Sequence, residues 1–503
     1  MTIPELDHFI DGSTCAPSSG EYMDVENPAT GEVISRVACG NAADVDRAVA
    51  AAQRAFDDPS WRLLPAADRA ALLNQFVGII KHNAQELAYL ESISSGGTVS
   101  RIGLDMLLIV DSIVTMADTV GSYPFTRSLP VRTVPEPTDV TVVMEPIGVC
   151  ALIPAWNMPM LLFMNKLLPA LAAGNTVVVK PSEQTPHTAL RLAQLLSPLL
   201  PPGVLNIVNG AGPVVGEAMA LHPGIGKISF TGSTAVGKRI QANSAASLKR
   251  VTLELGGKGA AIVTADADLD AAAYGALFGA MLNAGQACES GTRLLVHESI
   301  CEPLLARMAA LANGLSIGSP LDPLTSIGPM SNAAHGNRVL NYIRSALDEG
   351  AQLVCGGERI AVPGCEGGFF IAPTILANCD NRMKAVREEI FGPVLAIIKY
   401  SDIDEAIAIA NDSDYGLSAG IWTVDVVAAQ GIARRLRAGS VWINDWHQLR
   451  ADTPFGGYKQ SGQGRENGIA GLESFLETKA ITTAFQRDPA KKTMTYGIVH
   501  KTA

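Results

Sequence analysis

Short apolar runs alternate with helix-like segments between residues 175 and 255 of the chain. The clearest run is Val177-Val178-Val179, a continuous apolar stretch suited to a strand that is buried on both faces. Further strands are expected at 204–208, 227–230 and 251–255, and helices at 188–196, 213–221 and 234–242. Strands that alternate with helices require crossover connections, which produce a parallel sheet with helices on both faces. This stretch therefore predicts a doubly wound α/β domain.

A second series of strands and helices begins near residue 259 and continues to about residue 423. Its helices are expected at 269–283, 302–311 and 333–349. With 503 residues, of which 48% are apolar and 17% charged, the chain is long enough for two such domains around large cores. We therefore expect an α/β protein with two doubly wound parallel-sheet domains. The first would cover 1–130 and 146–257, and the second 258–450.

A β-ribbon is expected where the first domain is interrupted, at residues 131–145. Val and Thr alternate there between prolines, which is typical of a strand and not of a helix. Thr-rich alternation returns near the C-terminus, so the second ribbon segment is expected at 478–495. The two segments could pair and present an edge to another subunit.

Charge and hydropathy disfavour several classes of function. The net charge of −11, with no stripe of Lys or Arg, argues against a nucleic-acid partner, because phosphate binding needs clustered cations. The longest apolar stretches, such as residues 158–173, are broken by polar residues and prolines and are too short to span a membrane. Residues 1–10 hold two acidic residues and no apolar signal core, so export is not expected.

The eight cysteines show neither a Cys-x-x-Cys pair nor a nearby cluster of histidines. This spacing disfavours both a zinc site and a disulfide framework, so no metal is expected. A reducing cytoplasm is the compartment that fits such a chain best.

The positions of Cys288 and Glu254 predict the type of reaction that this chain could catalyse. Cys288 lies in the run Gly-Gln-Ala-Cys-Glu-Ser-Gly at an expected helix-to-strand junction, and Glu254 ends a predicted strand just before two glycines. A thiol can attack a carbonyl carbon, and a carboxylate can later draw a proton from water. Together they could oxidise an aldehyde through a thioester and then hydrolyse it. The alternatives are a buried apolar cysteine and a solvated glutamate at a strand end.

The neighbour of Cys288 is unexpected for a reactive thiol. Such a thiol needs partial exposure and a field that favours the thiolate, whereas Glu289 would place a second negative charge beside it. We therefore expect the Glu289 carboxylate to point away or to be paired.

Asn157 lies in a loop between Pro154 and Pro159. Its amide could donate a hydrogen bond to the oxyanion that forms when a thiolate attacks a carbonyl, with the backbone N–H of Cys288 as the second donor. The alternative is an asparagine that satisfies the backbone of its own turn.

Residues 230–238 follow a strand and open a helix, so their backbone N–H groups would suit a phosphate. The run nearly matches the P-loop of nucleoside-triphosphate-binding proteins. Arg239 stands where that loop needs Ser or Thr for magnesium, which disfavours a kinase. Residues 210–216 resemble the glycine fingerprint of dinucleotide sites, with one residue too many.

Two further pairs could hold a dinucleotide. Lys180 and Glu183 follow a strand at the carboxyl edge of the predicted sheet and could clasp a ribose diol. The Glu183 carboxylate would repel a 2′-phosphate and so favour NAD over NADP. Glu389 stands two residues before Phe391, and this pair could hold the nicotinamide ribose and wall its ring. The alternatives are a solvated surface pair and an ordinary loop entering a strand.

Taken in order, these motifs resemble the aldehyde dehydrogenase superfamily over nearly the whole chain, from Asn-Pro-Ala-Thr-Gly at 27–31 to residues 454–462. The resemblance implies oxidation of a small-molecule aldehyde with NAD, and hydrolysis of the thioester, because relatives that use coenzyme A lack a Glu at position 254. It implies that Cys288 is the nucleophile, Glu254 the general base and Asn157 the oxyanion donor. For the cofactor it implies contacts from Trp156, Lys180, Glu183, Gly212, Phe230, Ser233, Glu389 and Phe391.

The resemblance also assigns a role to each part of the chain. It implies that the first domain binds NAD, that the second is catalytic, and that the β-ribbon builds a homotetramer or a homodimer. The rival interpretation is a binding or structural protein that kept the fold and lost activity. The intact Cys288, Glu254 and Asn157 argue against it.

Departures from the commoner pattern bear on the substrate. Asn165 stands where relatives often carry an aromatic residue on the substrate funnel, and Glu289 replaces a neutral residue. Both favour a polar, amino- or aromatic aldehyde. The apolar run at 162–164 would instead suit an apolar one. The resemblance also places Trp446, Gln448 and Leu449 on a loop that lines the funnel.

Overall fold

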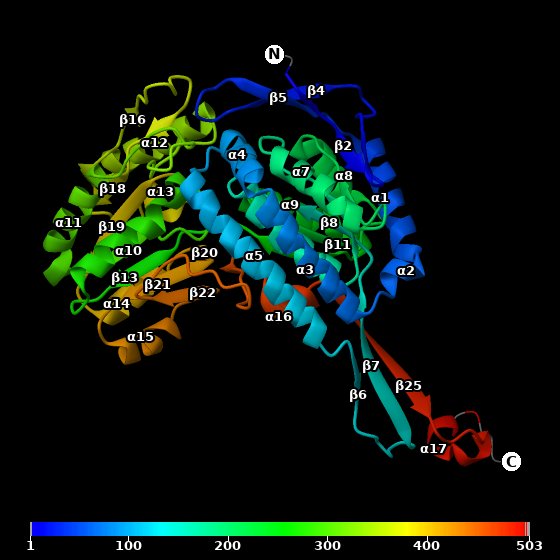
Figure 1. Ribbon diagram of the computed structural model, residues 1–503. Helices are drawn as coiled ribbons and strands as arrows, with labels where there is room; N and C mark the ends of the chain where they lie inside the picture. The colour runs from blue at the N-terminus through cyan, green and yellow to red at the C-terminus, as the bar shows by residue number, and fades with distance from the viewer. Residues whose placement is uncertain (1–2, 498, 500–503) are drawn as a thin grey trace.

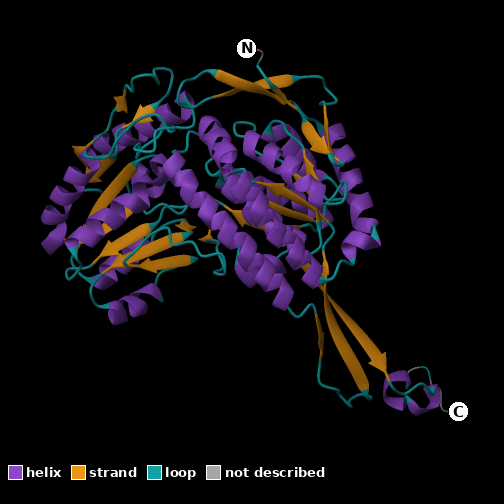
Figure 2. Cartoon of the chain, in the orientation of Figure 1, coloured by secondary structure: helices purple, strands orange, loops and turns teal. Residues whose placement is uncertain are grey.

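The computed structural model describes residues 3–497 and 499, and two large sheets within it are flanked by helices on both faces (Figure 1, Figure 2). A narrow ribbon of strands projects from the body below the first sheet. The predicted class, an α/β protein with two doubly wound parallel sheets, is confirmed by the strand pairing given below.

The first sheet has eight strands, and most of the residues that were predicted to contact the cofactor lie on these strands or directly after them. In order across the sheet they are β24 (Gly462–Gln463), β12 (Arg250–Glu254), β11 (Lys227–Thr231), β8 (Val149–Ile153), β9 (Thr176–Val179), β10 (Leu205–Ile207), β2 (His8–Ile10) and β3 (Ser13–Cys15). The strands from β12 to β10 run parallel, whereas β24, β2 and β3 are antiparallel additions at the two edges. Their parallel direction brings all their carboxyl ends to one edge of the sheet.

Alternate residues of β9 face two different apolar cores. Val177 and Val179 belong to a core with Phe163 and Leu192, whereas Val178 belongs to the core on the opposite face. A strand buried on both faces needs apolar residues at every position, which is why this run has no polar alternation. The helices of this half are α1 (Ala42–Asp57), α2 (Pro59–Arg62), α3 (Ala66–His82), α4 (Ala84–Ser95), α5 (Val99–Ser122), α6 (Pro159–Ala172), α7 (His187–Leu196), α8 (Glu217–Leu221) and α9 (Thr234–Ser244).

One predicted helix of this half differs from the structure. The segment expected as a single helix at 213–221 begins as a wide turn over Gly212–Gly216 and becomes α-helical only in α8. Pro213 lies in the first turn, where its missing N–H group costs nothing.

The second sheet has seven strands and its own core. In order they are β15 (Gln352–Cys355), β18 (Thr374–Ala377), β19 (Val394–Tyr400), β14 (Arg293–His297), β13 (Ala260–Val263), β21 (Ser418–Trp422) and β22 (Ser440–Ile443). All neighbours pair in parallel except β15. The surrounding helices are α10 (Leu269–Met281), α11 (Cys301–Asn313), α12 (Ala333–Asp348), α13 (Lys384–Arg387), α14 (Ile403–Asn411) and α15 (Val426–Ala433). The division of the chain into domains at the predicted boundaries remains our proposal.

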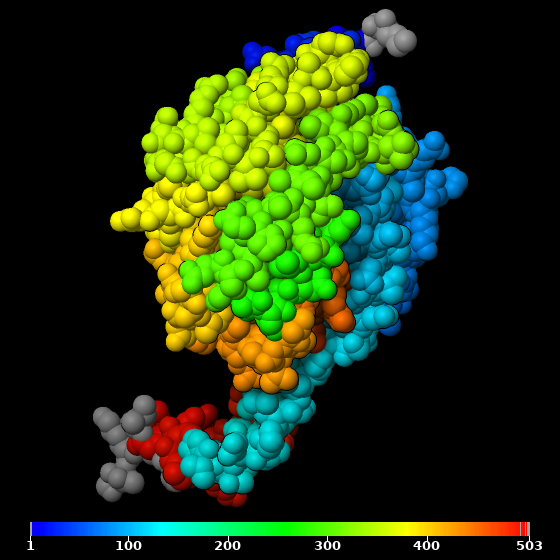
Figure 3. Space-filling view, turned by 90° about the vertical axis from the view of Figure 1, so that its left-hand side faces the viewer, coloured from blue at the N-terminus to red at the C-terminus, as the bar shows by residue number. Residues whose placement is uncertain are grey.

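The ribbon consists of β6 (Thr126–Ser128), β7 (Thr138–Pro146) and β25 (Leu476–Ala484). β7 and β25 are antiparallel along their whole length, from Leu476 opposite Pro146 to Ala484 opposite Thr138. Seen from the side in Figure 3, the ribbon stands away from the body of the protein. The strand ends at Ala484 and does not continue to 495, because Asp488 caps a helical turn that starts at Pro489.

The remaining strands and helices are short. They are β1 (Glu5–Leu6), β4 (Tyr22–Glu26), β5 (Val33–Ala38), β16 (Arg359–Ile360), β17 (Phe370–Ile371), β20 (Tyr415–Gly416), β23 (Tyr458–Lys459), α16 (Gly468–Glu473) and α17 (Thr493–Tyr496). Across residues 3–497 and 499, no helix is both long enough and apolar enough to cross a membrane.

Candidate active site

A tight turn after α10 positions Cys288. The helix ends at Met281, two residues before the predicted end, because Asn283 and Ala284 have φ angles of 55° and 56°. Gly285 follows with a φ of 69°, and a Cβ there would lie 2.1 Å from the carbonyl oxygen of Gly392. Only glycine can therefore occupy this position. The turn leaves Cys288 at the junction between α10 and β14, as the sequence predicted.

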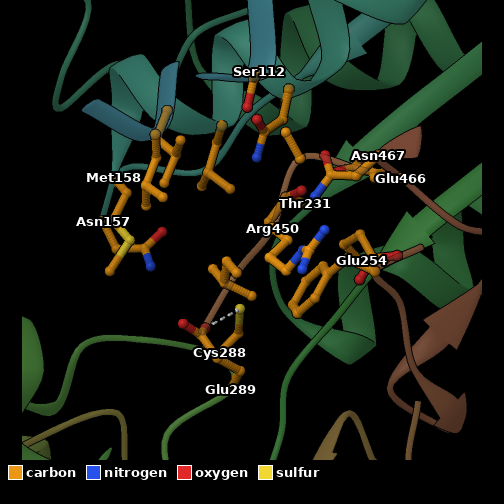
Figure 4. A pocket seen from close by; sticks show the side chains of 17 residues that line it. Ser112, Asn157, Met158, Thr231, Glu254, Cys288, Glu289, Arg450, Glu466 and Asn467 are labelled. Atoms are coloured by element: carbon orange, nitrogen blue, oxygen red, sulfur yellow. Dashed lines mark hydrogen bonds between the residues drawn. The ribbon is translucent and has the colours of Figure 1, made fainter. Parts of the chain in front are cut away.

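Cys288, Glu254 and Asn157 line one cavity, which we call the catalytic cavity (Figure 4). Glu254 comes from the end of β12, Asn157 from the loop after β8, and Cys288 from the loop before β14. The fold thus brings together the three residues that were predicted to act in one reaction.

The thiol of Cys288 is held in its protonated form. Sγ lies 3.2 Å from Oε2 of Glu289 and donates to it. Burial, and then the negative charge of Glu289, raise the pKa of Cys288 well above its usual value. The Glu289 carboxylate thus does not point away from the sulfur, and the negative charges of Glu389 and Glu254 also favour the thiol over the thiolate.

Asn157 is fixed in place by backbone groups. Its Nδ2 donates to the carbonyl oxygen of Gln286 at 2.9 Å, and Nδ2 of Asn283 donates to its carbonyl oxygen at 3.0 Å. An amide nitrogen carries two hydrogens, so one N–H can still be offered to a ligand in the cavity. The amide is anchored to the same turn that carries Cys288.

Glu254 is a buried carboxylate with no hydrogen-bond partner for either oxygen among the described residues. Burial raises its pKa well above the usual value, and the charge of nearby Glu466 raises it further. Glu466 itself is paired closely with Nζ of Lys166. A carboxyl group with a raised pKa that lines the cavity matches the requirements of a general base near neutral pH.

A second cleft lies at the carboxyl edge of the first sheet. Six of the predicted cofactor residues line it, namely Trp156, Lys180, Glu183, Gly212, Phe230 and Ser233. Open α/β sheets bind ligands at this edge. Thr231 lines both this cleft and the catalytic cavity, so the two spaces meet at the end of β11.

Lys180 and Glu183 form a preorganised pair in this cleft. Nζ of Lys180 donates to Oε2 of Glu183 at 3.0 Å and to the carbonyl oxygen of Pro181 at 2.9 Å. Burial would raise the pKa of Glu183, but the charge of Lys180 and the hydrogen bonds from Lys180 and from backbone N–H groups together hold this pKa below the usual value. Ser233 caps α9, whose first turn faces the cleft through Val236.

Glu389 and Phe391 lie beside this cleft and do not line it. Oε1 of Glu389 accepts a hydrogen bond of 2.9 Å from the backbone N–H of Gly257, and burial raises the pKa of Glu389 to about 7. The Phe391 ring meets the Trp156 ring edge-to-face at 5.4 Å between centroids, which connects it to the cleft wall.

The cleft fits a dinucleotide. It is large, it has one charged pair suited to a ribose diol, and it has a capped helix N-terminus. The hydroxyl of Thr231 is buried without a hydrogen-bond partner among the described residues, and it lies where the two spaces meet.

Comparison with known proteins agrees with this geometry. A model described as the aldehyde dehydrogenase family matches residues 15–481. The chain belongs to the aldehyde dehydrogenase family. The resemblance drawn from the motifs is thereby confirmed, and so is the prediction of an aldehyde-oxidising enzyme.

Individual members of the family are similar over almost their whole length. Retinal dehydrogenase 2 of Gallus gallus is 42% identical over 490 residues, which cover 94% of this chain and 91% of the relative. The structure of betaine aldehyde dehydrogenase from Staphylococcus aureus in complex with NAD+ is 36% identical, with a TM-score of 0.93 over 96% of this chain and 95% of its own. An indole-3-acetaldehyde dehydrogenase of P. syringae, also in complex with NAD+, is 39% identical, with a TM-score of 0.93 over 96% and 97%.

The substrate-side positions of this aldehyde dehydrogenase are only partly where they were expected. On α6, Leu162 and Asn165 line the catalytic cavity, whereas Phe163 and Met164 are buried in the core. Positions 158, 161, 162 and 165 share one face of the helix, so their neighbours must point elsewhere.

In the loop after β22, too, one of the expected residues lines the catalytic cavity and another is buried in the core. Leu449 lines the cavity, but Trp446 is fully buried and stacks on Trp422 at 5.9 Å between ring centroids. Its assignment to the funnel wall is wrong, because glycines at 259, 279, 291 and 420 leave the space that its indole fills.

Two buried pairs at the site were not predicted from the sequence. Lys166 and Glu466 lie 300 residues apart and meet close to Glu254. His447 pairs with Glu289 through a 2.9 Å contact between Nδ1 and Oε1. The only signal for the second pair in the sequence was Glu289 itself, next to the predicted nucleophile. We expected its carboxylate to point away or to be paired, and it is paired.

Proposed function

We propose that the protein oxidises an aldehyde to the carboxylic acid with NAD, with Cys288 as the nucleophile, Glu254 as the general base and Asn157 as an oxyanion donor. The observation that supports this assignment is the shared cavity. A thiol, a carboxylate and an amide line one space, and Thr231 joins that space to a cleft that fits a dinucleotide.

The first step is addition of Sγ of Cys288 to the aldehyde carbon. The developing oxyanion is stabilised by the free N–H of the Asn157 amide and by the backbone N–H of Cys288. When bound, NAD supplies the hydride acceptor for the oxidation of this adduct to a thioester. The rigid anchoring of Asn157 on Gln286 and Asn283 means that the donor needs little rearrangement.

The second step is hydrolysis of the thioester. Glu254 takes a proton from a water molecule, the resulting hydroxide adds to the acyl carbon, and the carbon–sulfur bond breaks to release the acid. The Glu254 carboxylate makes no hydrogen bond among the described residues, so it is available to orient this water. The charged groups of Lys166 and Glu466 lie close to this base. The negative charge of Glu466 raises the pKa of Glu254, and the positive charge of Lys166 lowers it.

The residues that would hold NAD are those that were predicted. Lys180 and Glu183 suit the adenosine ribose, and the Glu183 carboxylate favours NAD over NADP. Ser233 and the N-terminus of α9 suit the pyrophosphate, with Gly212 and Phe230 as walls. Trp156 and Phe391, whose rings are in contact, suit the nicotinamide ring, and Glu389 suits the nicotinamide ribose.

We propose a polar, amino- or aromatic aldehyde as the substrate. Ser112, Asn165 and Arg450 add polar groups to the cavity wall, while Leu161 and Phe455 add apolar surface. A wall of mixed character suits a substrate with both an apolar body and a polar group.

We also propose a cytoplasmic homotetramer or homodimer. All eight cysteines are free thiols, which suits a reducing compartment. The ribbon carries an edge strand, β25, along which exposed residues such as Ile481 can pair with another subunit.

The test is turnover with a panel of aldehydes and NAD, followed by the near-ultraviolet absorbance of NADH. We expect NADH formation with the wild type and none with Cys288→Ala, while binding of NAD is nearly unchanged. Glu302→Gln, an exposed position on α11, is the matched control. No NADH with any aldehyde would favour the alternative, an inactive binding or structural relative of the same fold.

A further inference from the structure

The carboxylate of Glu289 connects the sulfur of Cys288 to a histidine. Oε2 accepts from Sγ at 3.2 Å, and Oε1 contacts Nδ1 of His447 at 2.9 Å. The Glu289 and His447 side chains are 5% and 3% exposed, and Glu289 lines the catalytic cavity. The three groups therefore form a connected line from the reactive sulfur into the protein.

The surrounding structure fixes this arrangement. The carbonyl oxygen of Glu289 accepts hydrogen bonds from Nε1 of Trp446 at 3.0 Å and from Oγ of Ser418 at 2.8 Å. The His447 ring meets Phe278 edge-to-face at 5.2 Å between centroids. Both ends of the Glu289–His447 pair are thus anchored, and the carboxylate cannot turn away from the sulfur without losing its partner.

We propose that Glu289 is a catalytic base for the first step, which takes the thiol proton of Cys288 as the sulfur adds to the aldehyde, and that His447 is a positioning residue that holds this carboxylate. The S–H bond breaks and its proton moves to Oε2 of Glu289. The sulfur electron pair forms the S–C bond, and the carbonyl π pair moves onto oxygen. The proton returns to the sulfur when the C–S bond breaks in hydrolysis, and Glu254 releases the proton that it took from water to the solvent, so the cycle closes. The proposal rests on the assignment of Cys288 as the nucleophile.

The charges around the sulfur explain why a concerted transfer is favoured. The negative charges of Glu254 and Glu389 also raise the pKa of Cys288. The negative charges of Glu289 and Asp105 of α5 repel each other, and Asp105 is paired closely with Arg101. Glu466 and Arg450 line the same cavity, and Arg450 is paired with Asp452. A free thiolate would add another negative charge to this acidic site. Transfer of the proton during addition avoids that charge.

A different role for Glu289 predicts the opposite result. If its carboxylate only repels a thiolate, its removal lowers the pKa of Cys288, and the thiol becomes more reactive at neutral pH. If it is the base, its removal makes the thiol less reactive. The two roles therefore predict opposite changes in the reactivity of the Cys288 thiol when Glu289 is removed.

The experiment is the rate of Cys288 alkylation by iodoacetamide across a pH series, with the modified peptide quantified by mass spectrometry. The Cys288→Ala variant lacks this thiol and so shows which alkylated peptide belongs to Cys288. The Glu302→Gln variant is the control. Because this reaction needs neither aldehyde nor cofactor, its outcome stands even if the proposed turnover is absent.

We expect a wild-type rate that is nearly level over the pH range in which Glu289 is ionised and the thiol is protonated. Glu289→Gln should react about 100-fold more slowly at neutral pH, and its rate should rise about tenfold per pH unit. Glu289→Asp keeps the charge but draws the carboxylate back, so it should also be slow. Equal or faster alkylation of Glu289→Gln at neutral pH would overturn the proposal.

His447 provides an independent check. His447→Asn keeps an N–H donor near the position of Nδ1 and should retain the level pH profile, whereas His447→Leu should show the steep profile of Glu289→Gln. A level profile in both variants would remove the positioning role. Thermal unfolding of each variant shows whether it is folded, and Glu289→Asp keeps the test of the base open should Glu289→Gln not fold.

Discussion

Replacement of Glu254 by glutamine should separate the two halves of the reaction. The side chain keeps its size but loses its ability to accept a proton, so thioester hydrolysis should slow while hydride transfer continues. General bases contribute about 10²- to 10⁴-fold, which corresponds to about 3 to 5 kcal/mol in the activation free energy of this step. Because neither oxygen of Glu254 is hydrogen-bonded among the described residues, the substitution breaks no hydrogen bond of the protein.

The assay is a rapid-quench measurement in which enzyme, NAD and aldehyde are mixed and acyl-enzyme is trapped with acid. Glu254→Gln should give one burst of NADH per active subunit and then a slow steady state, with the acyl group recovered on Cys288. Exposed Glu302 provides the matched Glu→Gln control, which should turn over like the wild type. Wild-type turnover by Glu254→Gln, with no trapped acyl-enzyme, would refute the role of this carboxylate.

The raised pKa of Glu254 also predicts a dependence of stability on pH. In the unfolded chain a glutamate has a pKa of about 4.3, whereas burial raises the pKa of Glu254 well above its usual value in the folded protein. Its contribution to stability is therefore complete below the unfolded pKa and is lost as pH rises through the folded pKa. The free energy of unfolding of Glu254→Gln, measured by urea denaturation, should increase relative to the wild type as pH rises. A difference that stays constant with pH would contradict the assignment.

The remaining predictions concern the oxyanion, the cofactor and the assembly. Asn157→Ala should lower kcat by about 10²- to 10³-fold in the NADH assay, with NAD binding retained, and an unchanged kcat would exclude an oxyanion role. Glu183→Gln should narrow the ratio of kcat/KM for NAD over NADP, because the charge that repels a 2′-phosphate is gone; an unaltered ratio would remove its role in selectivity. Ile481→Lys, on the exposed edge strand, should shift the mass measured by light scattering toward smaller species, and an unshifted mass would argue against the ribbon as an interface.

The local pattern of the chain was sufficient for the regular elements of the first sheet. Val177-Val178-Val179 reads as a strand because every position is apolar, and the structure buries the three side chains in two cores on opposite faces. Boundaries were less well determined where backbone geometry interrupted the pattern. The helix predicted to reach 283 ends at Met281, because Asn283 begins a left-handed turn that apolar periodicity does not encode.

Close packing explains other positions that had no evident role in the sequence. Gly97 is one of them, since a Cβ there would lie 2.0 Å from the guanidinium of Arg101. Arg101 is buried and paired closely with Asp105, four residues further along α5. A side chain at position 97 would therefore have to displace this guanidinium, which the structure holds against the glycine.

The sequence by itself determined the chemical groups of the site, because Cys288, Glu254 and Asn157 each stand in a short motif whose residue types limit what the position can do. Tertiary structure decided the environment of those groups. Glu289 meets His447 across 158 positions, and this contact turns a charge that should hinder the thiol into a fixed acceptor for its proton. Such pairing depends on distances between segments remote along the chain, and neither periodicity nor motif spacing carries that information.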